Sequence, residues 1–353
     1  MKKRFLLTWL LLAPAMLIAQ GGGPGVNPAM LLRPPADAWP TYSGDLTGRR
    51  YSTLKQIDKT SVKNLSLAWV ARGFVEGSGP TGRGPGPARG GGGGGRGGGG
   101  GRGGAAAYPL NVGGLGTGEF NNGGPPNFRG SILMVDGVLY ASSPDNIWAV
   151  DARDGSTLWH YYWKTRGGTH TGHRGVGMWH NYIFTEFHDD YLVKLDAQTG
   201  QEQWRVEISP FEQQYFSSMA PIIIDNHVLV GTGDDIDAPG FLQSFDPDTG
   251  KRQWIFYTTP QNPGDPGLET WPSLDAARHG GGQVWVPGVF DPETRNYIFG
   301  TGNPTPAYTP AGRGEGVGLF TCSLIAVNVD TGKMSWYYQI GRASCRERVC
   351  QYV

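Results

Sequence analysis

The feature that most constrains this sequence is a short phrase that it contains four times. Each copy begins with an aspartate or asparagine, places a glycine four positions later and ends with a tryptophan eight positions after its start. An apolar run typical of a β-strand precedes each copy. The four copies run from Asp151 to Trp159, from Asp196 to Trp204, from Asp246 to Trp254 and from Asn328 to Trp336.

The chemistry of the phrase predicts a β-hairpin. The side-chain oxygen of Asp or Asn can accept a backbone N–H two residues further on, and glycine can adopt the positive φ that closes a three-residue loop with a bulge. The tryptophan then lies on the returning strand, where its flat ring can pack between neighbouring sheets. We therefore expect strands before the four turns, at residues 147–150, 192–195, 241–245 and 324–327.

The spacing of the tryptophans predicts the fold class. Trp159 and Trp204 are 45 residues apart, Trp204 and Trp254 are 50 apart, and Trp254 and Trp336 are 82 apart, which leaves room for one atypical unit around residues 290–294. A period of roughly 40 to 50 residues is typical of propeller blades, whereas a stacked β-solenoid, the alternative, has shorter repeats. The sequence predicts an all-β protein, an incomplete β-propeller with about four to five four-stranded antiparallel blades. Further strands are expected at residues 131–134, 138–142, 176–185, 222–224, 227–231, 284–290 and 296–301.

The first residues have the pattern of a secretory signal peptide. Lys2, Lys3 and Arg4 precede an apolar run that ends at Ala19, and this run is too short to span a bilayer. A short membrane anchor is the alternative. The prediction is a signal peptide over residues 1–19 and a periplasmic or secreted protein.

Composition divides the rest of the chain into five segments. The Gly/Arg-rich stretch cannot bury enough apolar surface to offset the entropy of ordering it, so it is expected to be disordered. Trp69 stands where a first blade would carry its tryptophan. The segments are a linker at residues 20–38, the start of the propeller at 39–72, the Gly/Arg-rich insert and loop at 73–127, the blades at 128–340 and a foreign or frameshifted tail at 341–353.

Charge and cysteine content exclude several classes of protein. The 30 Lys and Arg residues balance 30 Asp and Glu residues, which argues against nucleic-acid binding through bulk electrostatic attraction. Three cysteines are too few for a disulfide framework. The sequence has no Cys-x-x-Cys-His phrase, so no covalently attached c-type haem is expected, and the spacing of the seven histidines does not suggest zinc.

Several phrases resemble those of the quinoprotein alcohol and sugar dehydrogenases, a family of eight-bladed propellers that bind pyrroloquinoline quinone (PQQ). The resemblance covers nearly everything from Trp39 to Gln339 except the Gly/Arg-rich insert. It implies that the chain is the truncated N-terminal part of such a propeller. Beside the hairpin repeat, the matching phrases are Trp39-Pro40-Thr41-Tyr42, Arg50-Tyr51-Ser52, Glu269-Thr270-Trp271-Pro272, His279-Gly280-Gly281-Gly282, Gly300-Thr301-Gly302-Asn303-Pro304 and Thr321-Cys322-Ser323.

The resemblance implies a cofactor site and a metal site. In such a site an aromatic floor stacks on PQQ, cationic and hydroxyl groups hold its carboxylates, and Ca²⁺ with oxygen ligands polarises the quinone. Each residue also has an ordinary alternative, as a turn acid, a turn amide, a blade-packing tryptophan or a surface arginine. Carried over by position, the cofactor-binding residues are Arg174, Ser218, Thr232 and Trp285, and the metal ligands are Asp235 and Asn303.

The sequence departs from the family pattern at two places that matter for catalysis. The family has an aspartate that takes the proton of the substrate, in the position where this chain has Val317, and valine cannot act as a general base. Glu315 lies nearby and is a candidate substitute. The family also has a vicinal disulfide near the cofactor, but residues 165–171 contain no cysteine. We therefore expect no catalytic residue at the family position and an inactive chain.

The resemblance implies an exported dehydrogenase that oxidises an alcohol or a sugar by hydride transfer to Ca²⁺-bound PQQ. Its partners would be a small-molecule alcohol or sugar and an external electron acceptor such as cytochrome c or a quinone. The alternative is a non-catalytic propeller scaffold that binds protein partners in the periplasm. Such scaffolds usually lack the Gly-Thr-Gly-Asn-Pro phrase, which here is residues 300–304.

Overall fold

The structure is a computed structural model of the chain. The predicted signal peptide, the Gly/Arg-rich insert, the predicted tail and the predicted metal ligand Asp235 lie outside the residues that it describes. The described residues are 25–71, 128–166, 172–213, 215–233, 237–306 and 314–340.

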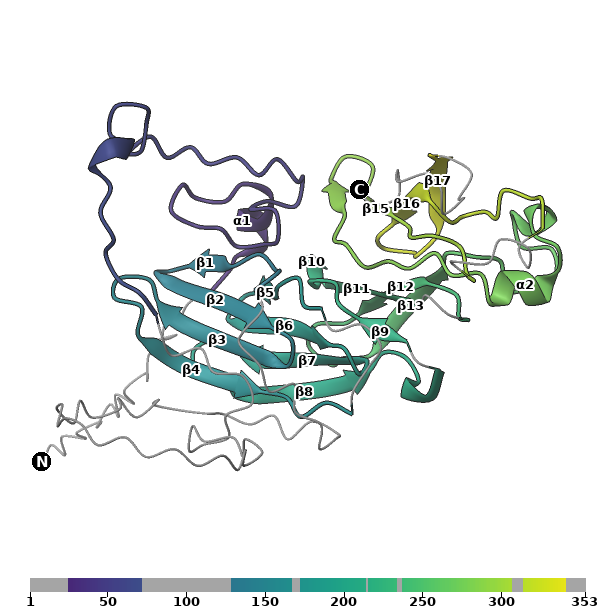
Figure 1. Ribbon diagram of the computed structural model, residues 1–353, viewed down its shortest axis with the longest axis horizontal. Coiled ribbons are helices and arrows are strands. Elements are labelled where there is room, and N and C mark those ends of the chain that lie inside the picture. Colours follow the sequence, from purple (N-terminus) through teal and green to yellow (C-terminus); the bar gives the residue numbers. More distant parts are fainter. Residues whose placement is uncertain are drawn as a thin grey trace, which may run out of the picture.

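The described residues form four antiparallel sheets, each of which is one meander of consecutive strands (Figure 1). The first blade contains β1 (Leu133–Val135), β2 (Val138–Ser143), β3 (Asn146–Asp151) and β4 (Thr157–Tyr162). The second contains β5 (Gly177–Trp179), β6 (Tyr182–Phe187), β7 (Tyr191–Asp196) and β8 (Glu202–Glu207). The third contains β10 (Ile222–Ile224), β11 (His227–Gly233), β12 (Phe241–Phe245) and β13 (Arg252–Tyr257), with the short β9 (Phe216–Ser217) paired to β11. The fourth contains β14 (Val289–Asp291), β15 (Asn296–Gly300), β16 (Ser323–Asn328) and β17 (Met334–Gln339).

This arrangement confirms the predicted all-β propeller with four-stranded blades and corrects three details. The predicted strand at residues 176–185 is two strands, β5 and β6, joined by a turn in which His180 has a φ of +51°. Of the predicted strand at 284–290, only the end belongs to β14. The turn at 290–294 joins β14 to β15 inside the fourth blade, so it is not a further unit. The long gap before Trp336 instead contains a connection with the helix α2 (Leu274–Arg278).

All four repeated turns form hairpins closed by a glycine with positive φ. In the second blade, Asp196 Oδ1 accepts the predicted backbone N–H two residues on, from Gln198 at 3.0 Å, and also that of Thr199 at 2.7 Å, and Gly200 has a φ of +72°. At Asn328 the backbone N–H that donates to the side-chain oxygen is that of the third residue on, Thr331, at 3.1 Å. The strand pairing shifts register next to each turn, as a bulge requires. The shifts lie at Ala149/Val150, Lys194/Leu195, Ser244/Phe245 and Ala326/Val327.

Two of the repeat tryptophans donate a hydrogen bond to the next blade, whereas Trp204 packs on Gly250 of the third blade without such a bond from its Nε1 among the described residues. Trp159 Nε1 donates to the Ala197 carbonyl at 2.9 Å, and Trp254 Nε1 donates to the Val329 carbonyl at 2.8 Å. In both cases the acceptor is the second residue of the turn in the following blade. Trp69 makes the same contact with the Ala152 carbonyl at 3.1 Å, although no strand surrounds it. The predicted role of Trp69 is therefore confirmed.

Strand burial follows from the stacking of blades. The middle strands β7 and β12 are buried along almost their whole length because both of their faces pack on neighbouring sheets. The outer strand β8 instead alternates between half-buried and exposed residues. The main core contains residues from all four blades, among them Tyr140, Ile183, Leu242 and Ile325.

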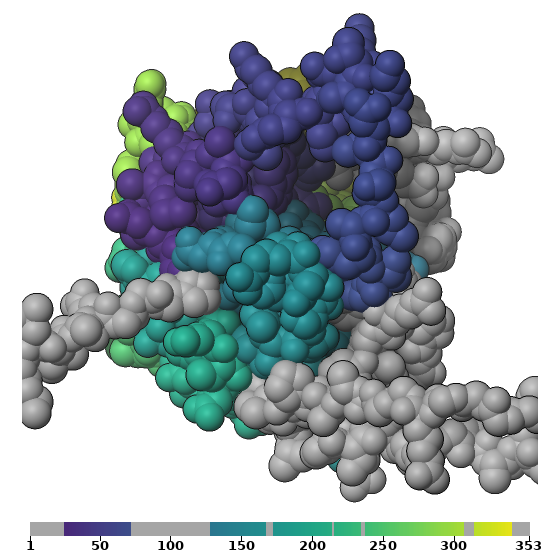
Figure 2. Space-filling model, turned by 90° about the vertical axis from the view of Figure 1, so that its left-hand side faces the viewer, coloured from purple at the N-terminus to yellow at the C-terminus, as the bar shows by residue number. Residues whose placement is uncertain are grey.

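The N-terminal part of the described chain packs across the inner strands of three blades. Backbone hydrogen bonds join Trp39 to Met134 in β1 and Leu46 to Phe290 in β14, and a bridge joins Val26 to the turn before β6. Figure 2 shows this segment as a purple-to-blue layer over the teal first and second blades. It includes α1 (Pro28–Leu32), a short helix within the stretch predicted to be a linker. Neither helix in the described residues is long enough to cross a membrane.

A glycine-to-alanine pair tests the contact between tryptophan and turn. Gly155 has a φ of +75°, and a Cβ there would lie 2.5 Å from Trp69 Cε3, whereas Gly137 has a φ of +77° with no atom within 4 Å. Gly137→Ala should therefore cost about 1 kcal/mol from backbone strain alone, and Gly155→Ala about 3 kcal/mol from strain plus overpacking. Urea unfolding measures both. Equal losses would show that Trp69 does not pack on the turn.

Candidate functional site

Three predicted cofactor residues contact one another at one place in the structure. Arg174 Nη1 donates to Ser218 Oγ at 2.6 Å and to the Ser218 carbonyl at 3.3 Å. The Arg174 guanidinium carbon lies 4.4 Å from the centre of the Trp285 ring, in a cation–π contact. Burial lowers the pKa of Arg174 from its ordinary value, but an arginine remains charged near neutral pH. The cluster thus presents a cation, a hydroxyl group and an aromatic face together.

The backbone around Arg174 is fixed by a buried histidine. The N–H of Gly175 points at His173 Nδ1 at 3.3 Å, so the ring proton is on Nε2, which donates to Thr185 Oγ1 at 2.8 Å. Burial lowers the pKa of His173 to about 3, so the ring is neutral. The Arg174 carbonyl also accepts the N–H of Ser131 at 2.9 Å, which ties this loop to the first blade.

Thr232, the fourth predicted cofactor residue, lies in β11 next to this cluster, but its hydroxyl group has a backbone partner. Thr232 is paired with Ser217, the neighbour of Ser218. Its Oγ1 donates to the Phe216 carbonyl at 2.5 Å, and its side chain is buried. In this structure Thr232 therefore holds β9 against β11.

The segments that carry the two predicted metal ligands are both held by residues 281–283. Asn303 accepts the N–H of Gly282 on its backbone at 2.9 Å. On the other side, Gly240 donates to the Gly281 carbonyl at 2.7 Å. Gln283 packs so closely on Gly233 and Gly302 that a Cβ at either glycine would collide with it. The chain on both sides of Asp235 and the chain around Asn303 therefore meet at the same short stretch.

The side-chain amide oxygen of Asn303 is the atom that could bind a cation. Its Nδ2 donates to the Pro304 carbonyl at 3.3 Å, which orients the amide, and the side chain is only partly buried. An amide oxygen is a ligand that Ca²⁺ and similar hard cations accept. No group of three His, Cys, Asp or Glu side chains suited to a metal occurs within the described part of the chain.

The structure places the predicted base position on an exposed loop. Val317 is 38% exposed, and its carbonyl accepts Gln339 Nε2 at 2.9 Å. Glu315 is also exposed. Gly318 donates to the Thr270 carbonyl at 3.3 Å, which fixes the end of this loop. No ionisable side chain stands at position 317 itself.

Sequence reasoning missed a buried ionisable cluster at the turn between β6 and β7. Glu186, His188, Asp189 and Asp190 are all at most 2% exposed. Burial raises the pKa of Asp190 to about 7, and burial together with the Asp190 charge raises the pKa of Glu186 well above its ordinary value. Burial alone would lower the pKa of His188, but Asp145, whose Oδ1 is 3.2 Å from His188 Nδ1, reverses this and raises it. The signal was visible as four ionisable residues within the five positions 186–190, between two strand-like runs.

Two surface pockets can be compared with the predicted site residues. One, of about 450 Å³, is lined by Asp237, His279 and Thr305 among others, so it borders the segments on which both predicted metal ligands lie. His279 Nδ1 is 2.9 Å from Asp237 Oδ1 at its wall.

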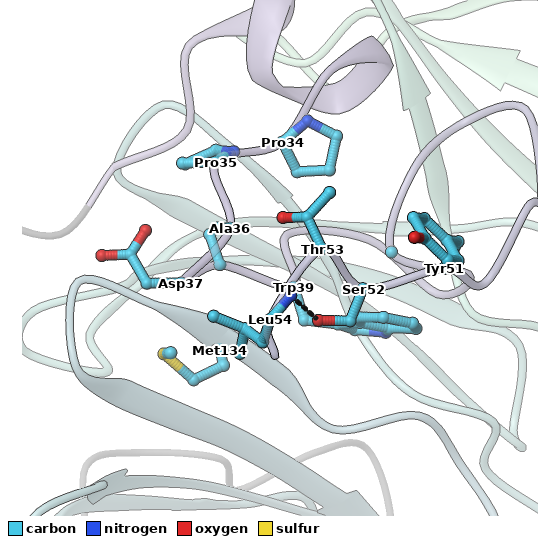
Figure 3. Close-up of a pocket in the computed structure, with 12 residues that line it drawn as sticks. Pro34, Pro35, Ala36, Asp37, Trp39, Tyr51, Ser52, Thr53, Leu54 and Met134 are labelled. Atoms are coloured by element: carbon cyan, nitrogen blue, oxygen red, sulfur yellow. Dashed lines mark hydrogen bonds between the residues drawn. The ribbon is translucent and has the colours of Figure 1, made fainter. Parts of the chain in front are cut away.

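The second pocket, of about 160 Å³, lies in the N-terminal segment and contains no predicted site residue (Figure 3). Pro34 and Pro35 lie on one side of it and Met134 on the other, and Leu54 N donates to Ser52 Oγ at 3.2 Å. It is a packing gap between this segment and β1.

The blades, the tryptophan contacts and the cluster of Arg174, Ser218 and Trp285 define the class of propellers that the sequence resembled, and comparison with known proteins agrees. The model of the PQQ family described as the glucose/ethanol/alcohol dehydrogenase β-propeller domain matches residues 116–343. The chain belongs to this family.

Individual relatives show how much of such a protein the chain covers. The chain is 31% identical to the dehydrogenase subunit of the quinone alcohol dehydrogenase of Gluconobacter oxydans, over 85% of the chain and 37% of that protein. It is 29% identical to the quinohemoprotein alcohol dehydrogenase ADH IIB of Pseudomonas putida, over 86% of the chain and 39% of that protein. The structure of the quinohemoprotein alcohol dehydrogenase ADHIIG of Pseudomonas putida superposes with a TM-score of 0.70 at 25% identity, over 90% of the chain and 42% of that structure. The chain thus spans well under half of the length of these relatives.

Proposed function

We propose that this chain is part of an exported PQQ-dependent dehydrogenase that oxidises an alcohol or a sugar. The observation that carries the proposal is the contact among Arg174, Ser218 and Trp285, which three separate segments bring together. The relatives named above are quinone-dependent alcohol dehydrogenases, which favours this class over a non-catalytic scaffold. The natural electron acceptor would be a cytochrome c or a quinone.

The residues present fit PQQ. PQQ is planar and carries three carboxylates, and the cluster offers the Arg174 guanidinium in contact with both the flat Trp285 ring and the Ser218 hydroxyl. Arg174 and Ser218 would hold carboxylates, and Trp285 would bound the flat face. Arg174 lies on the Trp285 ring in this structure. When the cofactor binds, Arg174 would give up this contact and contact a cofactor carboxylate.

The residues also fit a hard metal ion, which would be Ca²⁺ or another ion with the same preference for oxygen. Asn303 would bind through its amide oxygen. Asp235, which lies outside the described residues, is the proposed carboxylate ligand. When bound, the two groups supply a quinone that accepts electrons and an ion that polarises it. The chain itself would bind and orient them.

We propose further that this chain binds the cofactor without turning over alcohols. No side chain at position 317 can take up the substrate proton, and the nearby Glu315 is exposed on the same loop.

A titration of the purified chain with PQQ in the presence of Ca²⁺ tests this function. Saturable quenching of tryptophan fluorescence, with a matching change in PQQ absorbance, is the expected result, because the quinone would stack on Trp285. A dye-linked assay with ethanol or glucose is expected to show no turnover. Unchanged PQQ absorbance would favour the scaffold alternative, and turnover would contradict the proposed inactivity.

A further inference from the structure

The carboxyl group of Glu186 is buried in a place where no other side chain satisfies it. Glu186 lies near the end of β6 and is 1% exposed. Neither of its oxygens has a hydrogen-bond partner among the described residues, and the same is true of Asp190 Oδ2 nearby. A buried polar group without partners costs about 1 to 3 kcal/mol, so its presence in a core strand calls for a function.

The groups around Glu186 are neighbours of the predicted cofactor residues. The backbone N–H groups of Met219 and Gly231 lie close enough to lower its pKa in part, although neither forms a hydrogen bond of good geometry. Met219 follows Ser218 in the chain, and Gly231 precedes Thr232.

The residue next to Glu186 in β6 is linked to the loop that carries Arg174. Thr185, the residue before Glu186, accepts the hydrogen bond of the His173 ring, and His173 precedes Arg174. The charges of Arg174 and Glu186 also act on each other's pKa. Residues 185–186 of β6 therefore contact the immediate neighbours of three cofactor residues that come from two blades.

We propose that Glu186 is a positioning residue for the cofactor site. Its buried carboxyl group lies against the backbone N–H groups of Met219 and Gly231, and its volume and polarity thereby set where the neighbouring Ser218 and Thr232 lie relative to the Arg174 guanidinium. This inference rests on the proposed function, since it assigns Glu186 a role in binding a polyanionic quinone. Glu186 does not touch the cofactor in this proposal. It acts through the backbone that carries the groups that do.

The protonation state of Glu186 gives the proposal a distinctive consequence. The charged or titratable groups that interact with its carboxyl group are Asp190 from its own hairpin, Arg174 from the loop before β5 and Tyr297 from β15, while His173 contacts only the Glu186 backbone. Burial and Asp190 favour the neutral acid, and they outweigh the backbone N–H groups of Gly231 and Met219 and the charge of Arg174, which favour the ionised form. A neutral carboxyl group leaves the positive charge of Arg174 available to a cofactor carboxylate. Ionised Glu186 would compete for that charge and repel the cofactor.

PQQ dissociation constants of the full chain and two variants, measured at pH 6.5 and pH 9.5 with Ca²⁺ present, test the proposal. Glu186→Gln keeps the shape of the neutral acid, so its affinity at pH 6.5 should stay within about threefold of the unmodified chain. At pH 9.5 the unmodified chain should bind at least about tenfold more weakly than the Gln variant, because only its side chain can ionise. Glu186→Ala should lose about tenfold at both values. Glu207→Gln, an exposed glutamate on β8 of the same blade, is the control and should follow the unmodified chain.

The outcomes separate this inference from the function on which it rests. Identical pH profiles of the unmodified chain and Glu186→Gln, together with affinities of Glu186→Ala within twofold, would overturn the positioning role while the proposed function stands. Absence of PQQ binding by the unmodified chain would overturn both. Circular dichroism and thermal melting identify any variant that does not fold, and the Gln variant decides the question if the Ala variant fails.

Discussion

Replacement of Arg174 by alanine is expected to weaken PQQ binding about 100-fold, because it removes a cation that the structure places against both Ser218 and Trp285. The guanidinium group is partly buried, so its attraction for a carboxylate is less screened than that of a surface arginine. Lysine at this position should restore little of the loss. It keeps the charge, but it loses the planar fork that can contact a hydroxyl group and a ring face together. Fluorescence titration of the full chain measures each affinity.

A matched variant separates loss of a site from loss of structure. Arg166 is also a partly buried arginine in a cation–π contact, 4.3 Å from the centre of the Phe211 ring, and it pairs with Glu207 at 3.1 Å. Arg166→Ala removes the same kind of contact away from Trp285, so PQQ affinity should change by less than about twofold. Equal losses in the two variants would show that the cluster around Trp285 is not the binding site.

The sequence was sufficient to predict the parts of the fold that depend on local chemistry. The turn at Asp196 follows from an acceptor side chain and a glycine four positions later, and the structure shows both acting as expected. The docking of Trp69 was also predictable, because a tryptophan at blade spacing has only the next turn to pack against. Arg174, Ser218 and Trp285 were found through motifs that resemble a family, since nothing local relates residues so far apart.

The sequence-based predictions failed where the tertiary structure, and not the local sequence pattern, decides what a segment packs against. The turn at residues 290–294 has the same chemistry as the repeated turns, with Asp291 Oδ1 accepting the Glu293 N–H at 3.0 Å. Yet it joins the first two strands of a blade and not the last two, and only the strand pairing shows this. The sequence also did not predict that Glu186 is buried, because a glutamate in a strand usually faces solvent. Its surroundings come from Met219 and Gly231 of the next blade.

Asp190→Asn is expected to stabilise the protein at pH 8 and to have little effect on stability near pH 4. Asp190 is fully buried, and burial raises its pKa from 3.8 to about 7. Asparagine suits the site because the residue has a φ of +70°, which Asn tolerates, and because its amide oxygen can still accept Ser217 Oγ, now at 3.0 Å. The Oδ2 atom that becomes the amide nitrogen has no partner among the described residues.

The sign of the pH dependence follows from proton release on unfolding. Between pH 3.8 and about 7 the folded protein retains the Asp190 proton while the unfolded chain releases it, so stability is full below the lower value and falls as the pH rises. Above pH 7 the ionised group remains buried beside Asp189, and the accumulated loss is on the order of 4 kcal/mol. The Asn variant avoids this loss, so its free energy of unfolding in urea should exceed that of the unmodified chain by an amount that grows from pH 4 to pH 8. Asp136→Asn, at an exposed turn with a φ of +50°, should show no such growth. A constant difference between Asp190→Asn and the unmodified chain across this range would mean that Asp190 ionises without penalty, and that the turn between β6 and β7 is more accessible to water than its packing shows.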